Sequence, residues 1–104
     1  ALAQSGYGTS LIIYVKEASN NHPIFQARLT LQFNNHGGKL RKRGLITYNA
    51  KTNPQGRYRF TGIPFGTIRL IVTAQNHQTF SHEFQVTKNN QVINVKLKPP
   101  HPLL

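Results

Sequence analysis

Hydrophobic and polar residues alternate along most of this chain with a period of two. In the stretch 56–74, Tyr58 and Phe60 share one phase and Arg57 and Arg59 share the other. Successive side chains of a β-strand point to opposite faces of a sheet, so this alternation predicts a strand with one apolar face. We therefore expect both rings to be buried and both arginines to project into solvent.

A break follows, in which Gly62 and Gly66 bracket Pro64. Glycine and proline in this arrangement predict a turn between two half-buried strands. The alternation then resumes, and the residues expected to face inward are Ile68, Leu70, Val72 and Ala74. Those expected to face outward are Thr67, Arg69 and Thr73.

Similar alternation recurs in other segments, each bounded by turn residues. These segments span residues 10–16, 26–33, 45–51, 79–86 and 91–98. Lys88, Asn89 and Asn90 are typical of a hairpin turn between the last two of them. Short strands at this spacing, without helical periodicity, predict a seven-stranded antiparallel β-sandwich. Residues 1–9 would form an N-terminal arm, residues 10–98 the sandwich and residues 99–104 a proline-rich tail.

The charge balance is the most unusual property of the composition. The 104 residues include 13 Lys and Arg but only 2 Asp and Glu, which gives a net charge of +11. This imbalance exceeds what solubility requires, and it predicts a polyanionic partner such as nucleic acid or anionic glycan. Cysteine is absent, so neither disulfides nor thiolate metal sites can form.

A glycine-flanked loop at residues 36–44 concentrates this charge. Its cations could converge on phosphate or sulfate groups, whereas the plainer interpretation is a solvated connection. Together with outward-facing arginines, the loop predicts one continuous polyanion-binding face. The residues assigned to it are Lys39, Arg41, Lys42, Arg43, Arg57, Arg59 and Arg69.

Self-assembly is a second class of function that the pattern favours. The segment 10–16 carries apolar residues on both phases, although a sandwich needs only one inner face per sheet. The surplus indicates a covered outer surface, with the chain ends adding to a sheet edge. The residues assigned to this role are Tyr7, Ile12, Tyr14, Ile71, Val92, Leu103 and Leu104.

The chemistry expected of an enzyme is missing from the sequence. Glu17 and Glu83 are the only side-chain carboxylates, and the five histidines show no metal-ligand spacing. His82 falls on the inward phase between Phe80 and Phe84, where a core or edge histidine is expected. We therefore expect no catalytic residues, no metal and no cofactor.

Two stretches carry a family resemblance, HPIFQARLTL and TNPQGRYRFTGIPFGTIRLIVTAQNH. From about residue 10 to residue 98 the chain resembles the carboxypeptidase regulatory-like domain family, which has a prealbumin-like (transthyretin-like) sandwich. The residues that match the family pattern are Gly56, Tyr58, Phe60, Gly62, Pro64, Gly66 and Leu70. The resemblance implies structural roles for them and no catalytic residue.

The sequence departs from the family pattern at two turns. Asn53 and Gln55 stand where acidic residues are common, which argues against a calcium site because calcium prefers carboxylates. Asn76 and His77 replace a Gly-Tyr pair, and asparagine tolerates the left-handed conformation that such a turn needs.

The first residues bear on localisation. Ala1, Leu2 and Ala3 before Gln4 have the small-x-small form of a signal peptidase site. No segment is long and apolar enough to span a bilayer. We therefore expect a secreted or cell-surface, non-enzymatic module that binds polyanions, DNA among them, and assembles into a filament or matrix. The alternative is a cell-surface carbohydrate-binding or adhesion accessory domain.

Overall fold

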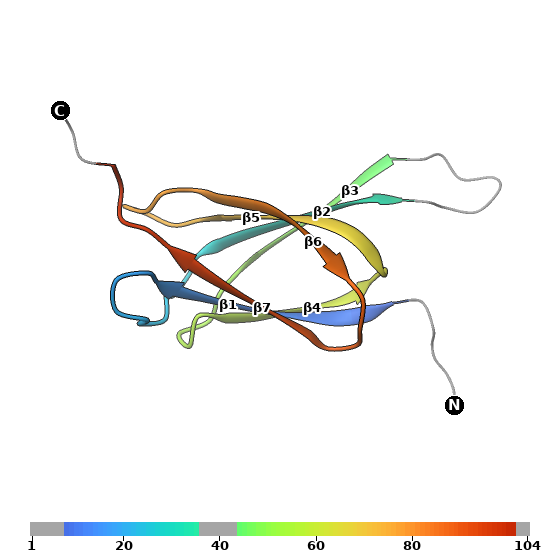
Figure 1. Cartoon of the computed structure of the whole chain (residues 1–104), viewed down its shortest axis with the longest axis horizontal. Helices are drawn as coiled ribbons and strands as arrows, with labels where there is room; N and C mark the ends of the chain where they lie inside the picture. The colour runs from blue at the N-terminus through green and yellow to red at the C-terminus, as the bar shows by residue number, and fades with distance from the viewer. Residues whose placement is uncertain (1–7, 36–43, 102–104) are drawn as a thin grey trace.

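The computed structural model describes residues 8–35 and 44–101, and within them the chain forms strands and no helix (Figure 1). The strands are β1 (Thr9–Glu17), β2 (Arg28–Asn35), β3 (Gly44–Lys51), β4 (Arg57–Ile63), β5 (Gly66–Thr73), β6 (Phe80–Val86) and β7 (Gln91–Leu97). They make two layers, a three-stranded sheet in the order β4-β1-β7 and a four-stranded sheet in the order β3-β2-β5-β6. The predicted all-β, seven-stranded sandwich is confirmed.

One pair of strands departs from the antiparallel prediction. β1 and β7 run parallel, with Ile13 opposite Ile93 and Val15 opposite Val95. A short hairpin would force these two strands to be antiparallel, but they are separated by all the other strands of the domain. Their relative direction is set instead by the crossovers between the sheets, so alternation along either strand could not reveal it.

The turns between β4 and β5 and between β6 and β7 are crossovers between sheets, whereas the turn between β5 and β6 joins two antiparallel neighbours of one sheet. The break at Gly62 to Gly66 carries the chain from the three-stranded to the four-stranded sheet, with φ of 69° and 119° at the two glycines. The hairpin predicted at Lys88 to Asn90 is wrong, because β6 and β7 lie in different sheets. Asn76, with φ of 62°, adopts the left-handed conformation that the sequence predicted.

The core lies between the sheets and is made by the inward phase of the central strands. The burial expected for Phe60, Ile68, Leu70 and Val72 is confirmed. The other apolar side chains that are buried are Leu11, Ile13, Val15, Ile24, Ala27, Leu29, Leu31, Phe33, Ile63, Val86, Ile93, Val95 and Leu97. Apolar burial on this scale drives the two sheets together.

The predicted inward phase is not buried everywhere. Tyr58 on edge strand β4 remains 37% exposed, and His82 on edge strand β6 is exposed between the half-buried rings of Phe80 and Phe84. Ala74, just after β5, is also only half-buried. An edge strand lacks a neighbour on one side, and three strands cannot cover both edges of a four-stranded sheet. The expectation of a buried Tyr58 is therefore wrong, whereas His82 lies on the inward phase opposite Leu70 as an edge histidine.

A buried threonine connects β3 to the loop before β2. The hydroxyl of Thr52 donates to the carbonyl of Ile24 at 2.6 Å and accepts from the backbone N–H of Ala27 at 2.9 Å. Gly56, four residues later, has φ of 72°, and a Cβ there would lie 2.5 Å from the carbonyl oxygen of Val15. This turn requires glycine for both its conformation and its close approach to β1.

Candidate polyanion-binding surface

The outer face of the three-stranded sheet is built around β1. Residues paired in register share a face, so Ile12 lies in one row with Arg59 of β4 and Val92 of β7. In the next row Tyr14 lies between Arg57 and Asn94.

Beyond Tyr14, Lys16 of β1 lies beside Lys96 of β7. We call the surface formed by Arg57, Arg59, Lys16 and Lys96 the cationic face. These cations border a short apolar and aromatic strip formed by Ile12, Tyr14 and Val92, the arginines on its β4 side and the lysines at one end. Lys16 and Lys96 were not assigned to a site from the sequence, because their proximity depends on the parallel register of β1 and β7.

The two side-chain carboxylates of the chain are both engaged elsewhere. Glu83 lies 3.2 Å from the guanidinium of Arg69, which also donates to the hydroxyl of Ser81 at 2.9 Å. Glu17 lies 2.8 Å from the imidazole of His77, and its hydrogen bond is the main cause of a raised pKa at that histidine. Neither carboxylate balances charge on the cationic face.

Arg69 is not part of the cationic face. It belongs to β5, where it is paired in register with Gln32 of β2 and Glu83 of β6 on the four-stranded sheet. Outward-facing residues of different sheets lie on opposite sides of a sandwich. The expectation of one continuous face that includes Arg57, Arg59 and Arg69 is therefore wrong.

The residues assigned to self-assembly are divided in the same way. Ile12, Tyr14 and Val92 lie together on the three-stranded sheet, and Val92 is 48% exposed. Ile71 lies on the other sheet, beside Thr30 and Ser81. The remaining candidates lie outside the described residues, and these are Tyr7, Lys39, Arg41, Lys42, Arg43, Leu103 and Leu104.

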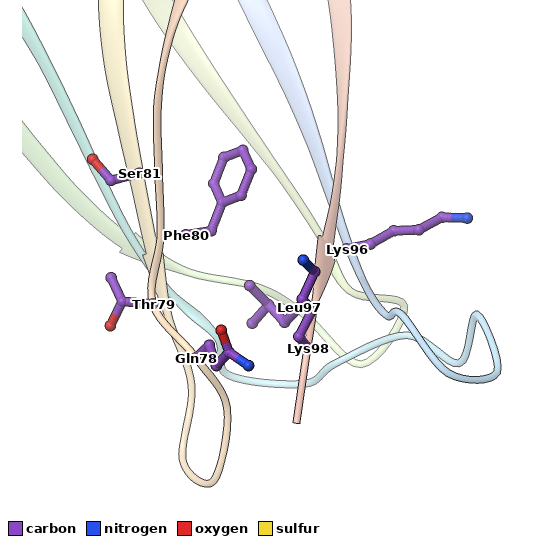
Figure 2. Close-up of a pocket in the computed structure, with 7 residues that line it drawn as sticks. All are labelled: Gln78, Thr79, Phe80, Ser81, Lys96, Leu97 and Lys98. Carbon is purple, nitrogen blue, oxygen red and sulfur yellow. The ribbon is translucent and has the colours of Figure 1, made fainter. Parts of the chain in front are cut away.

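The edge between β6 and β7 holds a hollow of about 230 Å³ (Figure 2). Phe80 and Leu97 point into the space between the strands, whereas Ser81 and Lys96 point away on opposite sides. Hydrogen bonds bridge this edge, from the backbone N–H of Gln78 to the carbonyl of Lys98 at 3.0 Å and from its side chain to the carbonyl of Pro99 at 2.9 Å.

The described residues do not form a reactive cluster. Within residues 8–35 and 44–101, no group of three or more His, Cys, Asp or Glu side chains could hold a metal ion. Glu17 and Glu83 belong to separate ion pairs on different strands and do not face each other as an acid and base pair would. None of the described segments is a helix suited to crossing a membrane.

Fold and surface together define a small β-sandwich module. Residues 11–98 match the carboxypeptidase regulatory-like domain, and the chain belongs to this family. The matched range includes both stretches that carry the resemblance in the sequence. No curated protein matches the sequence closely enough to count as a relative.

Solved structures of similar fold include pilins. The Streptococcal ancillary pilin matches with a TM-score of 0.62 and 17% identity, over 88% of this chain and 29% of the pilin. Shaft pilin SpaA from Lactobacillus rhamnosus GG matches with a TM-score of 0.67 and 10% identity, over 92% of this chain and 47% of the pilin.

The isolated C-terminal domain of SpaA matches with a TM-score of 0.65 and 10% identity, over 88% of this chain and 98% of that domain. The chain therefore spans less than half of the two pilins and nearly the whole of one of their domains. At these identities the likeness concerns the fold.

Proposed function

We propose that this domain is a non-enzymatic structural module of an extracellular or cell-surface protein, and that it binds polyanions through its cationic face. The observation that carries the proposal is the distribution of charge. Both side-chain carboxylates are held by Arg69 and His77, so the cations gathered around Tyr14 have no carboxylate side chain to balance them.

The spacing of the strands brings these cations within range of one another. Neighbouring strands lie about 4.8 Å apart, and alternate residues along a strand lie roughly 7 Å apart. These separations are shorter than the Debye length of about 8 Å at physiological ionic strength, so adjacent cations, Arg57 with Arg59 and Lys16 with Lys96, repel each other. A chain of phosphate, sulfate or carboxylate groups laid across the face relieves this repulsion.

The strip beside the cations adds a contact that does not depend on the base sequence of the ligand. Tyr14 can contact a base or sugar ring, while Arg57 and Arg59 bind the backbone charges of the polymer. Binding through backbone charge positions the ligand without selecting a base sequence. DNA and anionic glycans are both ligands of this kind.

A surface role and self-assembly belong to the same proposal. The pilin domains with this fold support a structural role outside the cell. The half-exposed Val92 beside Ile12 offers apolar contact area, but four cations on the same face oppose direct pairing of two copies. A polyanion held between two such faces removes that repulsion, so we expect assembly to require the polyanion.

The test compares two variants that lose positive charge on opposite sheets. Arg57→Gln combined with Arg59→Gln removes two charges from the cationic face, and Arg69→Gln combined with Lys51→Gln removes two from the other sheet. Affinity for duplex DNA is measured as a function of salt concentration. Each phosphate contact contributes about −0.9 to the log–log slope, so the first pair flattens the slope by nearly 2 and the second leaves it near the wild-type value.

Equal flattening by both pairs would contradict the cationic face as the site. Salt-insensitive binding to a neutral oligosaccharide, together with no DNA binding at low ionic strength, would favour the carbohydrate-binding alternative.

A further inference from the structure

Within residues 8–35 and 44–101, the sandwich is open along the edge where β3 faces β4. A cleft of about 420 Å³ separates the two strands, and Tyr48 and Tyr58 line it from opposite sheets. Both rings point inward by register, because Tyr48 is paired with Leu31 and Tyr58 with Ile13. Even so, Tyr48 is 40% exposed and Tyr58 is 37% exposed.

Each ring packs against a phenylalanine of its own sheet. Tyr48 packs edge-on against Phe33 with ring centroids 5.7 Å apart, and Tyr58 packs edge-on against Phe60 at 4.9 Å. These contacts hold each tyrosine on its own sheet. The remaining ring surface borders the cleft and is available to an apolar side chain.

Along this cleft the outer edge of β4 has no partner strand among the described residues. The carbonyl of Arg57 accepts from the backbone N–H of Asn53 at 3.0 Å, and its N–H donates to Oδ1 of Asn53 at 2.9 Å. The backbone groups of Arg57 are thus turned away from β1. Because backbone direction alternates along a strand, those of Arg59 are turned the same way, and no described strand pairs with them.

The backbone of β3 has the same property. The N–H of Thr52 donates to the carbonyl of Ala27 at 3.0 Å, in the direction of β2. Alternation from Thr52 turns the backbone groups of Asn49 and Thr47 to the other side, where β3 has no described neighbour. Two unpaired strand edges therefore flank one aromatic cleft, whereas the β6 and β7 edge is bridged by Gln78.

We infer that an extended peptide, in which apolar and acidic residues alternate, adds as an antiparallel strand to the free edge of β4. Its apolar side chains enter the cleft between Tyr48 and Tyr58. Its acidic side chains lie on the outer face beside Arg57 and Arg59. An added strand forms hydrogen bonds with the unpaired backbone groups, and its alternate side chains contact the inner and the outer face of the sheet.

Charge complementarity selects β4 and this kind of partner. The outward cation that lines the cleft on β4 is Arg59, whereas on β3 the outward residues that line it are the neutral Thr47 and Asn49, and the cation Lys51 lies at the end of that strand. A second copy of this chain does not fit, because its two acidic residues, Glu17 and Glu83, are far apart in the sequence and already engaged. The inference goes beyond the proposed function and does not depend on polyanion binding.

The experiment uses a fluorescently labelled eight-residue peptide that alternates valine and glutamate, with binding followed by anisotropy. Two further peptides carry N-methyl groups, one on the glutamate nitrogens and one on the valine nitrogens. When the peptide adds antiparallel to β4, the peptide residue opposite Arg59 lies on the same face of the sheet and forms backbone hydrogen bonds with Arg59. Methylation at glutamate is therefore expected to weaken binding about tenfold or more, and methylation at valine to change it little.

A matched pair of variants tests the cleft. Tyr58→Ser removes a half-exposed ring from the cleft, and Phe65→Ser removes a ring of 52% exposure from the turn after β4. We expect the first to weaken peptide binding by about tenfold and the second to leave it unchanged. Circular dichroism of each variant reports whether it folds, and the methylated peptides test the inference on the wild-type chain.

If methylation at glutamate and methylation at valine weaken binding equally, strand addition is refuted and only charge attraction is left to explain the binding. Equal effects of Tyr58→Ser and Phe65→Ser would overturn the cleft as the site. Duplex DNA binding by the same variants is measured in parallel. If Tyr58→Ser loses peptide binding but keeps DNA binding, the inference is supported. If the wild-type chain does not bind DNA, only the proposed function is refuted.

Discussion

The imidazole of His77 lies 2.8 Å from the carboxylate of Glu17, measured from Nε2 to Oε1. This contact joins the turn after β5 in one sheet to the end of β1 in the other. The second ring nitrogen, Nδ1, lies 2.7 Å from the carbonyl oxygen of Gln75. Because both neighbours are acceptors, the ring donates to both only when it is protonated.

The pKa of His77 is accordingly raised from 6.5, chiefly by the hydrogen bond to Glu17, while partial burial acts in the opposite direction. A raised folded-state pKa means that the native chain binds this proton more tightly than the unfolded chain does. The stabilisation is fully present below pH 6.5 and is lost as pH rises through the folded-state pKa.

We therefore expect the free energy of unfolding to fall with rising pH in the wild type more than in His77→Gln. Urea unfolding from about pH 5.5 to about pH 9 measures this difference. Glu17→Gln is the partner control, because it removes the carboxylate that is the main cause of the raised pKa and should therefore reduce the same pH dependence. Parallel pH profiles for the wild type and His77→Gln would contradict the assignment.

Burial distinguishes two aromatic residues of β4. Phe60 is 4% exposed in the core, so Phe60→Ala is expected to lower the free energy of unfolding by about 3–5 kcal/mol. Tyr58 keeps 37% of its surface exposed, and Tyr58→Ala should cost roughly half as much or less because less area leaves water. Denaturant unfolding of both variants checks the order, and an equal cost would be inconsistent with an open β4 edge.

The turn at Gly56 should not accept a side chain. Gly56→Ala places a Cβ at φ of 72° and 2.5 Å from the carbonyl oxygen of Val15, and we expect a loss of about 1 kcal/mol or more. Gly44→Ala is the control, since a Cβ there meets nothing within 4 Å. Its effect on thermal or urea unfolding should stay within about 0.5 kcal/mol. A neutral Gly56→Ala would refute the close approach of this turn to β1.

The basic loop can be tested apart from the cationic face. Replacing Lys39, Arg41, Lys42 and Arg43 with glutamine should flatten the salt dependence of DNA binding by about 3 to 4 in log–log slope if all four meet phosphates. The weakening should be similar for unrelated DNA sequences, because phosphate contacts do not read bases. A control variant, which loses the same positive charge, replaces four other cations with glutamine: Arg28, Lys51, Arg69 and Lys88. The same loss in both variants would mean that net charge, not the loop, governs binding.

Assembly should depend on the apolar strip and on a bound polyanion. We expect Val92→Thr to reduce oligomers formed with DNA, because Val92 is half-exposed beside Ile12 on the cationic face. Sedimentation velocity with and without DNA measures the distribution. Ile71→Thr, on the opposite sheet, serves as the control, and an equal loss there would move the contact to the four-stranded sheet. A wild type that stays monomeric under both conditions would refute self-assembly.

Local patterns were sufficient to predict the strands and much of the core. Alternation identified each strand within a few residues, and it identified Phe60, Leu70 and Val72 as buried. Such predictions succeed because the period of two is a property of the strand itself. The left-handed turn at Asn76 is predictable for the same reason, since it depends on the residue type at one position.

Only the tertiary structure determined which residues from distant segments of the chain become neighbours. Arg59 and Arg69 both lie on the outward phase of their strands. Arg59 belongs to the three-stranded sheet and has no carboxylate partner among the described residues, whereas Arg69 belongs to the four-stranded sheet, where it is paired with Glu83. Likewise, Tyr58 alternates as a core residue would but lies on an edge. The sequence by itself determined which residues form strands and which face of each strand is apolar, because those properties are local. Which strands are neighbours, in which direction they run and which edges stay open followed only from packing two unequal sheets together, because that depends on the burial of the whole chain at once.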